Sequence, residues 1–565
     1  MWTGEDRDRV ELNGAQALEH RLHPGAARGT GATAAQQPLG PERRPAGLGS
    51  GDLEHGHGAI LPPKGPARYP AHAVILAIDQ GTTGTTCLVF DDQAELIGRA
   101  YREFEQHFPE PGWVEHDADE IWQVTQAVAG EALDDAGLRP GELEAVGITN
   151  QRETVCVWDP HSGESLHRAI VWQDRRTAGR CDALRAAGYE PLVRTRTGLV
   201  LDPYFSGTKI EWLLGNVPGL RERAEEGRAA FGTIDAWLIF KLTGEYATDP
   251  SNAARTMLFD IGAGAWDPEL LELLGVPARA LPEVRPSSGT LGMTRPEALH
   301  GHTVPVAGVA GDQQAALFGQ ACVTPGMCKS TYGTGSFVLQ NTGSQRPPPA
   351  PGLLGTVAWG IGQRLSYALE ASIFVTGAAV QWLRDGLRII DDARETEQLA
   401  ASLQANDGVY FVPALTGLGS PHFDPYARGT IVGLTRGSTR AHLARATLEA
   451  IAYQTVDAVR AIEAASHEPL SELRADGGAT ANAWLMQFQA DMLGVPVLVP
   501  EIAETTALGA AYLAGVGVGV WTIERVGASS RERRRFEPAM SADERETLHH
   551  GWRRALERAR GWVEA

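Results

Sequence analysis

Two short turns rich in glycine and threonine each stand between two apolar, strand-like runs. The first turn covers residues 80–86 and follows Asp79, and the second covers residues 331–335. Glycine lets the backbone approach a ligand closely, and successive amides in a tight turn form a nest for anions. Threonine adds hydroxyl donors without adding charge. Two such turns facing each other would hold a polyphosphate from both sides, which predicts a nucleotide site between two domains.

The common nucleotide-binding motifs are absent from both turns. Neither strand is followed by G-x-x-x-x-G-K-[ST], and Val338 stands where a dinucleotide fingerprint would have its third glycine. A single Gly/Thr hairpin is more often an ordinary turn than a phosphate site. Asp79 adds weight to the phosphate interpretation, because a carboxylate there could hold a metal ion beside phosphate oxygens.

A polar run at residues 150–154 interrupts two apolar strand-like segments. Its adjacent Arg152 and Glu153 can donate to and accept from neighbouring hydroxyl groups, as polyol binding requires, although such a pair is often only solvated surface. Asp312 and Gln313 open a helix of small residues. They offer either a helix cap or a base and an amide for a substrate hydroxyl.

Two further polar segments are candidates for ligand contact. Tyr204 lies on a loop bent by Pro203, and residues 475–482 end a strand and open a helix with two adjacent glycines. The second segment would suit close approach of an adenine or its ribose. The structural alternative for each is a capped turn.

Composition limits the class of protein. The chain has 565 residues, of which 43% are hydrophobic and 21% charged, so two or more globular domains are expected. A net charge of −20 argues against nucleic acid or an anionic membrane surface as a partner. The five cysteines are scattered without a C-x-x-C pair, which predicts neither zinc nor disulfides and favours a reducing, cytoplasmic setting.

The chain divides into an extension and two domains. Residues 1–70 lack apolar periodicity and are expected to be a disordered N-terminal extension. Beyond it, strands alternate with helices, which favours α/β sheets with helices on both faces. The predicted strands are 74–78, 145–149, 155–158, 304–309 and 408–411, and the predicted helices are 119–136, 205–214, 235–242 and 439–464.

Two helices, 311–319 and 505–514, carry unusually small side chains. Small residues let helix axes approach closely, which suits sliding at a domain junction or simple tight packing. Residues 506–523 are almost uncharged, but Gly515, Gly517 and Gly519 argue for a buried helix and a turn rather than a membrane span.

The order and wording of these motifs resemble those of the FGGY carbohydrate kinases over residues 74–565. Within that family, the strings at 149–154 and 202–209 are typical of the members that act on glycerol. The other matching strings are 111–117, 311–320, 331–335, 424–429 and 506–515. The resemblance implies two actin-like/ribonuclease-H-like ATPase domains, 71–320 and 321–565, with the active-site cleft between them.

The resemblance also implies a role for individual residues. Asp312 would be the general base, and Asp79 would hold Mg²⁺. The residues matching glycerol-binding positions are Arg152, Glu153, Tyr204, Asp312 and Gln313, with Trp172 and Phe337 as apolar walls. The residues matching nucleotide-binding positions are Thr82, Thr83, Gly84, Thr334, Gly377, Gln381, Gly478 and Asn482.

The sequence departs from the family pattern in two places. The first turn commonly reads Thr-Thr-Ser-Ser-Arg after its glycine, whereas Gly84 and Thr86 replace the first serine and the arginine here. Ser336 replaces a frequent cysteine. Losing a hydroxyl and a guanidinium removes two phosphate partners, so altered nucleotide affinity is expected rather than inactivity.

The implied activity is ATP-dependent phosphorylation of glycerol to sn-glycerol 3-phosphate in glycerol catabolism. The implied setting is a cytoplasmic homo-oligomer that uses Mg²⁺-ATP. One alternative is a kinase for another polyol or a ketopentose, which should lack the set of Arg152, Glu153, Tyr204 and Trp172. Another is a catalytically silent nucleotide binder, against which Asp79 and Asp312 argue.

Overall fold

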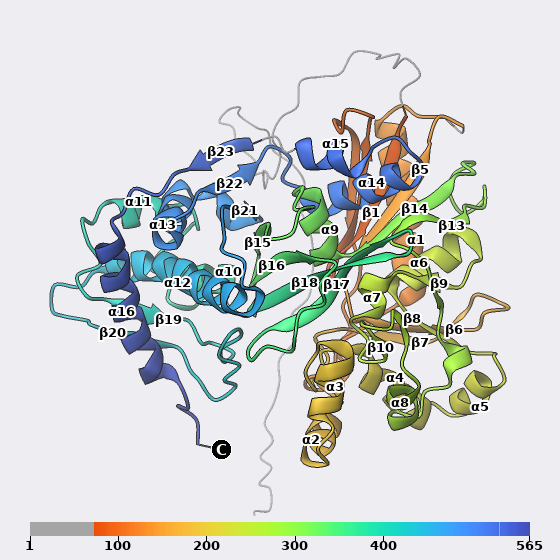
Figure 1. Cartoon of the computed structure of the whole chain (residues 1–565), viewed down its shortest axis with the longest axis horizontal. Coiled ribbons are helices and arrows are strands. Elements are labelled where there is room, and N and C mark those ends of the chain that lie inside the picture. Colours follow the sequence, from red (N-terminus) through yellow and green to blue (C-terminus); the bar gives the residue numbers. More distant parts are fainter. Residues whose placement is uncertain (1–72, 140, 530–531, 565) are drawn as a thin grey trace, which may run out of the picture. The chain divides into compact units, whose positions relative to one another are not determined.

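The computed structural model describes residues 73–139, 141–529 and 532–564 (Figure 1). The prediction of a disordered extension over 1–70 lies outside these residues. Within them, strands and helices alternate along most of the chain, as the sequence predicts.

One mixed sheet of thirteen strands runs through the described residues, with the order β23-β22-β21-β15-β16-β18-β17-β13-β14-β5-β1-β2-β3. Its strands from the first half of the chain are β1 (Ile75–Gln80), β2 (Gly84–Phe90), β3 (Leu96–Glu103), β5 (Ala145–Asn150), β13 (Ser288–Met293) and β14 (Pro305–Gly311). Those from the second half are β15 (Cys328–Tyr332), β16 (Ser336–Gly343), β17 (Leu354–Ile361), β18 (Arg364–Ile373), β21 (Leu473–Asp476), β22 (Val497–Pro500) and β23 (Glu532–Phe536).

Smaller sheets lie outside this one. A four-stranded sheet has the order β4-β7-β6-β8, and three two-stranded sheets pair β10 with β11, β12 with β9, and β19 with β20. Their strands are β4 (Glu115–His116), β6 (Val155–Trp158), β7 (Ser165–Ile170), β8 (Ala230–Thr233), β9 (Ala247–Thr248), β10 (Phe259–Asp260), β11 (Ala265–Trp266), β12 (Glu283–Val284), β19 (Tyr410–Val412) and β20 (Thr430–Val432).

The α-helices cover the sheet or fill the outer parts of each half. In the first half they are α1 (Ala118–Asp135), α2 (Ala178–Ala186), α3 (Glu190–Thr197), α4 (Ser206–Asn216), α5 (Leu220–Glu225), α6 (Ile234–Thr243), α7 (Pro250–Ala253), α8 (Pro268–Leu273) and α9 (Asp312–Gly319). In the second half they are α10 (Gly377–Gln381), α11 (Glu395–Ala401), α12 (Arg440–Ser466), α13 (Ala483–Leu493), α14 (Thr505–Gly517), α15 (Ile523–Ala528) and α16 (Ala542–Ala559).

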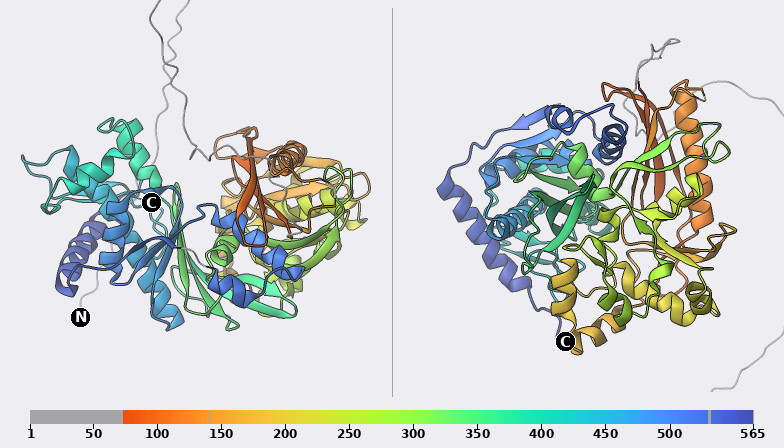
Figure 2. Two further views of the ribbon diagram at one scale, coloured as in Figure 1. Left: turned by 90° about the horizontal axis from the view of Figure 1, so that it is seen from above. Right: turned by 45° about the vertical axis from the view of Figure 1, so that its right-hand side comes forward.

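Both faces of the large sheet are buried at its inner strands, whereas the edge strands β3 and β23 are partly exposed. In β1, Leu76 and Ile78 pack into a core with α1 and α6, whereas Ile75 and Ala77 pack into another core with α9 and α14. This follows from the two-residue period of a strand, which sends alternate side chains to opposite faces. Figure 2 shows the orange helix α1 lying against the red strands of this end of the sheet. In the second half, α12 and α13 supply the core on one face.

The two helices of small residues, α9 and α14, pack directly on each other beside the sheet (Figure 1). A Cβ added at Gly509 would lie 1.8 Å from the carbonyl oxygen of Ala315, and one added at Gly319 would lie 1.9 Å from that of Thr505. Glycine is therefore required at both crossing points, because the two backbones touch there. No helix among the described residues combines the length and apolar character needed to cross a membrane.

The halves of the large sheet meet at a very short junction. β13 and β17 are parallel neighbours, but their register contains a single pair, Ser288 with Ile361. A hydrogen bond from the Gly360 amide to the Ser287 hydroxyl, 2.8 Å long, supports the same junction. The rest of each half is joined by longer ladders.

The predicted elements form with boundaries that shift by a few residues. Thr439 caps α12 at its N-terminus, with a reciprocal hydrogen bond from its backbone amide to His442, the third residue of the helix. The first Gly/Thr turn is shorter than predicted. Gly84, Thr85 and Thr86 belong to β2, so the turn itself contains only residues 81–83.

Candidate active site

The first Gly/Thr turn is held in place through its carbonyl groups. The side-chain amides of Gln80 and Gln151 donate to the Gly81 carbonyl at 2.8 and 3.1 Å, and that of Gln106 donates to the Thr82 carbonyl at 3.0 Å. The backbone amides of Thr82 and Thr83 have no partner among the described residues. The turn thus presents unpaired N–H groups, as an anion nest requires.

The second turn, between β15 and β16, is built similarly. The Gly333 amide donates to the Gly335 carbonyl at 2.8 Å, while the amides of Thr334 and Gly335 have no partner in the described part of the chain. A Cβ at Gly335 would lie 2.4 Å from the Ile373 carbonyl oxygen, so the turn is tight against β18. Ser336, at the position of the frequent cysteine, shares a 2.8 Å hydrogen bond with the Thr376 hydroxyl.

Arg152 is the centre of a buried ion cluster. Its side chain is 2% exposed, and its Nε lies 3.0 Å from Asp312 Oδ1 while its Nη1 lies 2.6 Å from Glu370 Oε2. Burial opposes the positive charge, but the surrounding carboxylates outweigh it and hold the pKa of Arg152 above its ordinary value. The structure thus brings together Arg152 and Asp312, which are far apart in the sequence.

Glu153 faces the same cluster with one oxygen unused. Its Oε1 accepts a 2.6 Å hydrogen bond from Arg255 Nε, whereas its Oε2 is buried and has no partner among the described residues. Its backbone has φ of +62°, a left-handed conformation that is rare for a glutamate. A strained backbone persists only where the surrounding structure stabilises it, and such residues are common at ligand sites. Here the strain accompanies a buried carboxylate oxygen that could accept a hydrogen bond from a ligand.

Three members of this cluster escaped the sequence analysis: Arg255, Lys329 and Glu370. Arg255 donates to Glu153 and to Glu370, whose Oε1 is 3.1 Å from Arg255 Nη2. Burial would raise the pKa of Glu370, but Arg152 and Arg255 lower it to about 2. The signal in the sequence is a single charge within a strand, since Lys329 is the one charged residue of β15 and Glu370 follows five uncharged residues of β18.

Lys329 links the cluster to the second turn. Its Nζ donates to the side chains of Gln313 and Thr331, the latter at 2.8 Å. Burial lowers the pKa of this ammonium to about 8. Gln313 is therefore oriented by a lysine from the other half of the chain.

Aromatic side chains form a wall beside the cluster. Trp172 and Tyr204 meet edge to face with ring centroids 5.6 Å apart, and Arg152 lies over the Phe337 ring at 5.7 Å. Trp172 also donates from Nε1 to the Thr82 hydroxyl at 2.9 Å, which connects the wall to the first turn. The loop that carries Tyr204 is held by the buried Lys209, which donates to the Tyr204 carbonyl at 2.6 Å.

Asp79 lies close enough to Asp312 for their charges to interact. Burial, together with the nearby charge of Asp312, raises the pKa of Asp79 to about 7. The described residues contain no group of three or more His, Cys, Asp or Glu side chains that could enclose a metal ion. A cation here would depend on phosphate oxygens and water for its other ligands, as is usual for Mg²⁺.

Of the predicted adenosine residues, Gly377 contacts the second turn directly, and Gly477, the neighbour of Gly478, packs against the end of β15. The Gly377 amide donates to the Gly333 carbonyl at 3.0 Å, and a Cβ at Gly477 would lie 2.3 Å from the Tyr332 carbonyl oxygen. Gly478 and Gln381 are exposed beside these contacts. Asn482 is also the N-cap of α13, since its Oδ1 accepts from the Leu485 amide at 2.9 Å.

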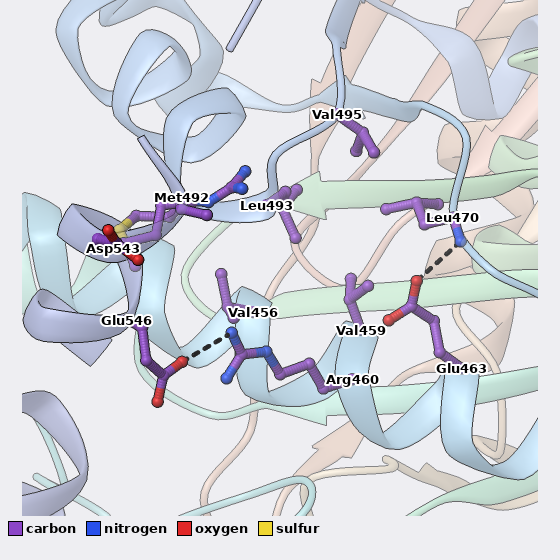
Figure 3. Close-up of a pocket in the computed structure, with 12 residues that line it drawn as sticks. Val456, Val459, Arg460, Glu463, Leu470, Met492, Leu493, Val495, Asp543 and Glu546 are labelled. Atoms are coloured by element: carbon purple, nitrogen blue, oxygen red, sulfur yellow. Dashed lines mark hydrogen bonds and ion pairs between the residues drawn. The ribbon is translucent and has the colours of Figure 1, made fainter. Parts of the chain in front are cut away.

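A cavity of about 460 Å³ lies elsewhere, among α12, α13 and α16 (Figure 3). None of its lining residues belongs to the predicted site. Its polar side chains already contact one another or the backbone: Arg460 lies 3.7 Å from Glu546, and Glu463 accepts from the Leu470 amide at 2.8 Å. This cavity therefore offers little unsatisfied chemistry to a ligand.

Comparison with known proteins identifies the family. Residues 74–319 match the N-terminal domain of the FGGY family of carbohydrate kinases, and residues 328–518 match its C-terminal domain. Relatives named glycerol kinase come from Halorhodospira halophila (56% identity over 490 residues, 86% of this chain and 97% of the relative) and Symbiobacterium thermophilum (58% over 492 residues, 86% and 99%).

A solved structure gives the same result. The Plasmodium falciparum glycerol kinase with ADP superposes with a TM-score of 0.83 and 34% identity, over 87% of this chain and 99% of that one. The predicted class, α/β with two actin-like/ribonuclease-H-like ATPase domains, is confirmed by these matches. The chain belongs to the FGGY family of carbohydrate kinases.

Proposed function

We propose that this chain transfers the γ-phosphoryl group of ATP to glycerol and releases sn-glycerol 3-phosphate and ADP. Relatives with 55–58% identity over most of the chain are named glycerol kinase, and a similar solved structure holds ADP. The observation that carries the proposal is the pairing of Asp312 with Arg152 beside the Glu153 Oε2, which has no partner within the described part of the chain. That arrangement offers a base, a fixed cation and a free acceptor to a small polyol.

Glycerol has little surface, so convergent hydrogen bonds must fix its orientation. Arg152, Glu153, Tyr204, Asp312 and Gln313 supply these bonds in the proposal. Trp172 and Phe337 supply apolar contact with the carbon chain. The Glu153 Oε2 accepts a hydrogen bond from one hydroxyl group, which satisfies a buried acceptor that has no partner among the described residues.

In the chemical step, the Asp312 carboxylate takes the proton of the attacking primary hydroxyl. The hydroxyl oxygen forms a bond to the γ-phosphorus, and the bond from that phosphorus to the bridging oxygen breaks, releasing ADP. Arg152 holds the Asp312 carboxylate in place through the 3.0 Å contact of its Nε with Oδ1. Closure of the cleft would exclude water that could otherwise hydrolyse ATP.

The nucleotide is assigned to the two turns. In this proposal the phosphates contact Thr82, Thr83, Gly84 and Thr334. The support is that both turns carry backbone amides without a partner among the described residues. Gly377, Gln381, Gly478 and Asn482 contact the adenosine. The proposed domains are 71–320, with the first turn and the glycerol site, and 321–565, with the second turn and the adenosine site.

Magnesium fits the residues present. Burial and, to a lesser degree, the charge of Asp312 disfavour an ionised Asp79, and a divalent cation would offset both effects. Asp79 would hold the ion, which when bound neutralises phosphate charge. The five cysteines are free and buried, which supports a cytoplasmic location, and a homo-oligomeric state completes the proposal.

The first experiment measures ADP release from ATP and Mg²⁺ with and without glycerol, and with dihydroxyacetone, erythritol or xylulose in its place. We expect release with glycerol to exceed that with erythritol and xylulose by a large factor. Preference for xylulose would favour a ketopentose kinase. No release with any acceptor, despite ADP binding, would favour a silent nucleotide binder.

A further inference from the structure

Tyr101 on β3 lies on the same face of the sheet as Asp79. In the strand register, Asp79 pairs with Thr86 and Thr86 pairs with Tyr101. Directly paired residues point to the same face, and neighbouring strands lie about 4.8 Å apart. The Tyr101 backbone is therefore roughly 10 Å from that of Asp79, within reach of the first turn for a side chain of this length.

The Tyr101 ring fills the space where a side chain at position 84 would lie. A Cβ added at Gly84 would be 2.7 Å from Tyr101 Cε2 and 2.8 Å from Tyr101 Oη. Gly84 is one of the positions where the family commonly has another residue, a serine. The glycine and the tyrosine are thus complementary, because the missing side chain makes room for the ring.

The phenol lies beside the first turn. Partial burial raises the pKa of Tyr101, while a hydrogen bond with the Thr83 side chain lowers it. Its hydroxyl also lies 3.4 Å from Glu103 Oε1, a weak contact. Tyr101 is 49% exposed, so a ligand at the turn can reach it.

We propose that Tyr101 is a nucleotide-binding residue whose hydroxyl donates to a phosphate oxygen held at the first turn. The Tyr101 hydroxyl replaces the hydroxyl of the serine that the family commonly has at position 84. The absence of a side chain at Gly84 leaves room for the Tyr101 ring. This inference rests on the proposed function, since it needs the phosphates to lie at the turn of residues 81–83. It identifies Gly84 and Tyr101 as one coupled pair.

The first test compares Tyr101→Phe with the wild type by calorimetric titration of ADP with Mg²⁺. Loss of one hydrogen bond to a charged oxygen should raise the Kd for ADP by about tenfold or more. The KM for ATP should rise similarly, while the KM for glycerol and the melting temperature of the ligand-free protein should stay unchanged. Tyr426→Phe is the matched control, because Tyr426 is 46% exposed and belongs to a different part of the chain.

The second test is a double-mutant cycle with Gly84→Ala and Tyr101→Ala. When Tyr101 is present, the methyl group added by Gly84→Ala should displace the ring and raise the Kd for ADP. In the Tyr101→Ala background, Gly84→Ala should raise the Kd for ADP by a several-fold smaller factor. Some cost remains in both backgrounds, because the methyl group also approaches the Arg102 carbonyl oxygen at 2.7 Å, so the coupling is the difference between them.

An unchanged Kd for ADP in Tyr101→Phe would overturn the phosphate contact, and an additive cycle would overturn the pairing with Gly84. Both titrations are made without glycerol. Failure of the proposed function would instead appear as a wild type that binds ADP but does not phosphorylate glycerol. The two failures are therefore distinguishable.

Discussion

The Asp312 carboxylate lies between a fixed cation and open space. Arg152 Nε is 3.0 Å from one of its oxygens, yet 34% of the aspartate side chain is exposed. The Asp312 carboxylate is therefore fixed in its orientation and remains accessible to a substrate hydroxyl. That combination suits a general base better than a structural ion pair.

Asp312→Asn keeps the shape of the side chain but removes its ability to accept a proton. We expect kcat with glycerol to fall by about 10²–10⁴-fold, with little change in the Kd for ADP. Initial rates in an ADP-coupled assay and calorimetric titration measure the two effects. Asp182→Asn, at a side chain 75% exposed, is the control. If the Asp312→Asn protein kept the wild-type kcat, Asp312 could not be the general base.

Glu370 balances two buried guanidinium groups. Glu370→Gln removes a carboxylate that compensates the buried positive charges of Arg152 and Arg255. Such a loss typically lowers the free energy of unfolding by about 3–5 kcal/mol. Urea unfolding measures the loss. Glu283→Gln, at a side chain 65% exposed, should change stability by less than about 0.5 kcal/mol.

The same residue gives a pH dependence with a definite sign. The folded-state pKa of Glu370 is about 2 against an ordinary 4.5, so its stabilising contribution is complete above about pH 4.5. That contribution is lost as the pH falls toward 2. The stability difference between the wild type and Glu370→Gln should therefore shrink over this interval. A difference that grew with acidity would contradict the assignment.

Single residues are also where sequence reasoning reached its limit. Arg152, Glu153 and Asp312 could be singled out because each belongs to a recognisable polar string. Arg255, Lys329 and Glu370 could not, because each is a lone charge outside such a string, and its role becomes visible only from its contacts in the structure. The sequence shows that Gly84 lacks the hydroxyl of the usual serine. Nothing in the sequence pattern indicates that the Tyr101 ring fills the space of that side chain.

At the scale of elements, the contact between α9 and α14 controls the position of Asp312. α9 begins at Asp312, and its later turns touch α14 through glycine on each side. The sequence predicted both helices from their small residues, but sliding and tight packing were equally compatible with that pattern. The structure shows the tight packing.

Gly509→Ala tests that contact. The new methyl group would lie 1.8 Å from the Ala315 carbonyl oxygen, so the helices must separate. We expect a stability loss of about 1–3 kcal/mol or more and a lower kcat, because α9 carries Asp312. Gly179→Ala, where nothing lies within 4 Å, is the control and should be neutral or slightly stabilising. An equally stable and active Gly509→Ala protein would contradict the requirement for glycine.

At the scale of the whole molecule, the proposed site depends on both family-matched segments. Arg152 and Asp312 lie within 74–319, whereas Lys329, Phe337 and Glu370 lie within 328–518. The alternation of strands and helices was enough to predict two α/β domains. It could not predict that their strands form one continuous sheet, because pairing between distant strands leaves no periodic signal.

A site shared in this way should couple its ligands. We expect glycerol to lower the Kd for ADP by about 5–150-fold, the usual range for coupled sites, and ADP to lower the Kd for glycerol by the same factor. Titration of each ligand with and without the other measures both values. Equal Kd values in both conditions would show that the two ligands bind independently.

The single register pair between Ser288 and Ile361 has a mechanical consequence. Two strands that pair over many residues resist relative movement because many hydrogen bonds must break together. Strands joined at a single residue pair resist twisting very little. Most of the stiffness between the halves must therefore come from packing, including the close contact of α14 with α9, and not from strand pairing. Temperature or pressure, which loosen packing first, should soften this seam well before either half of the sheet begins to melt.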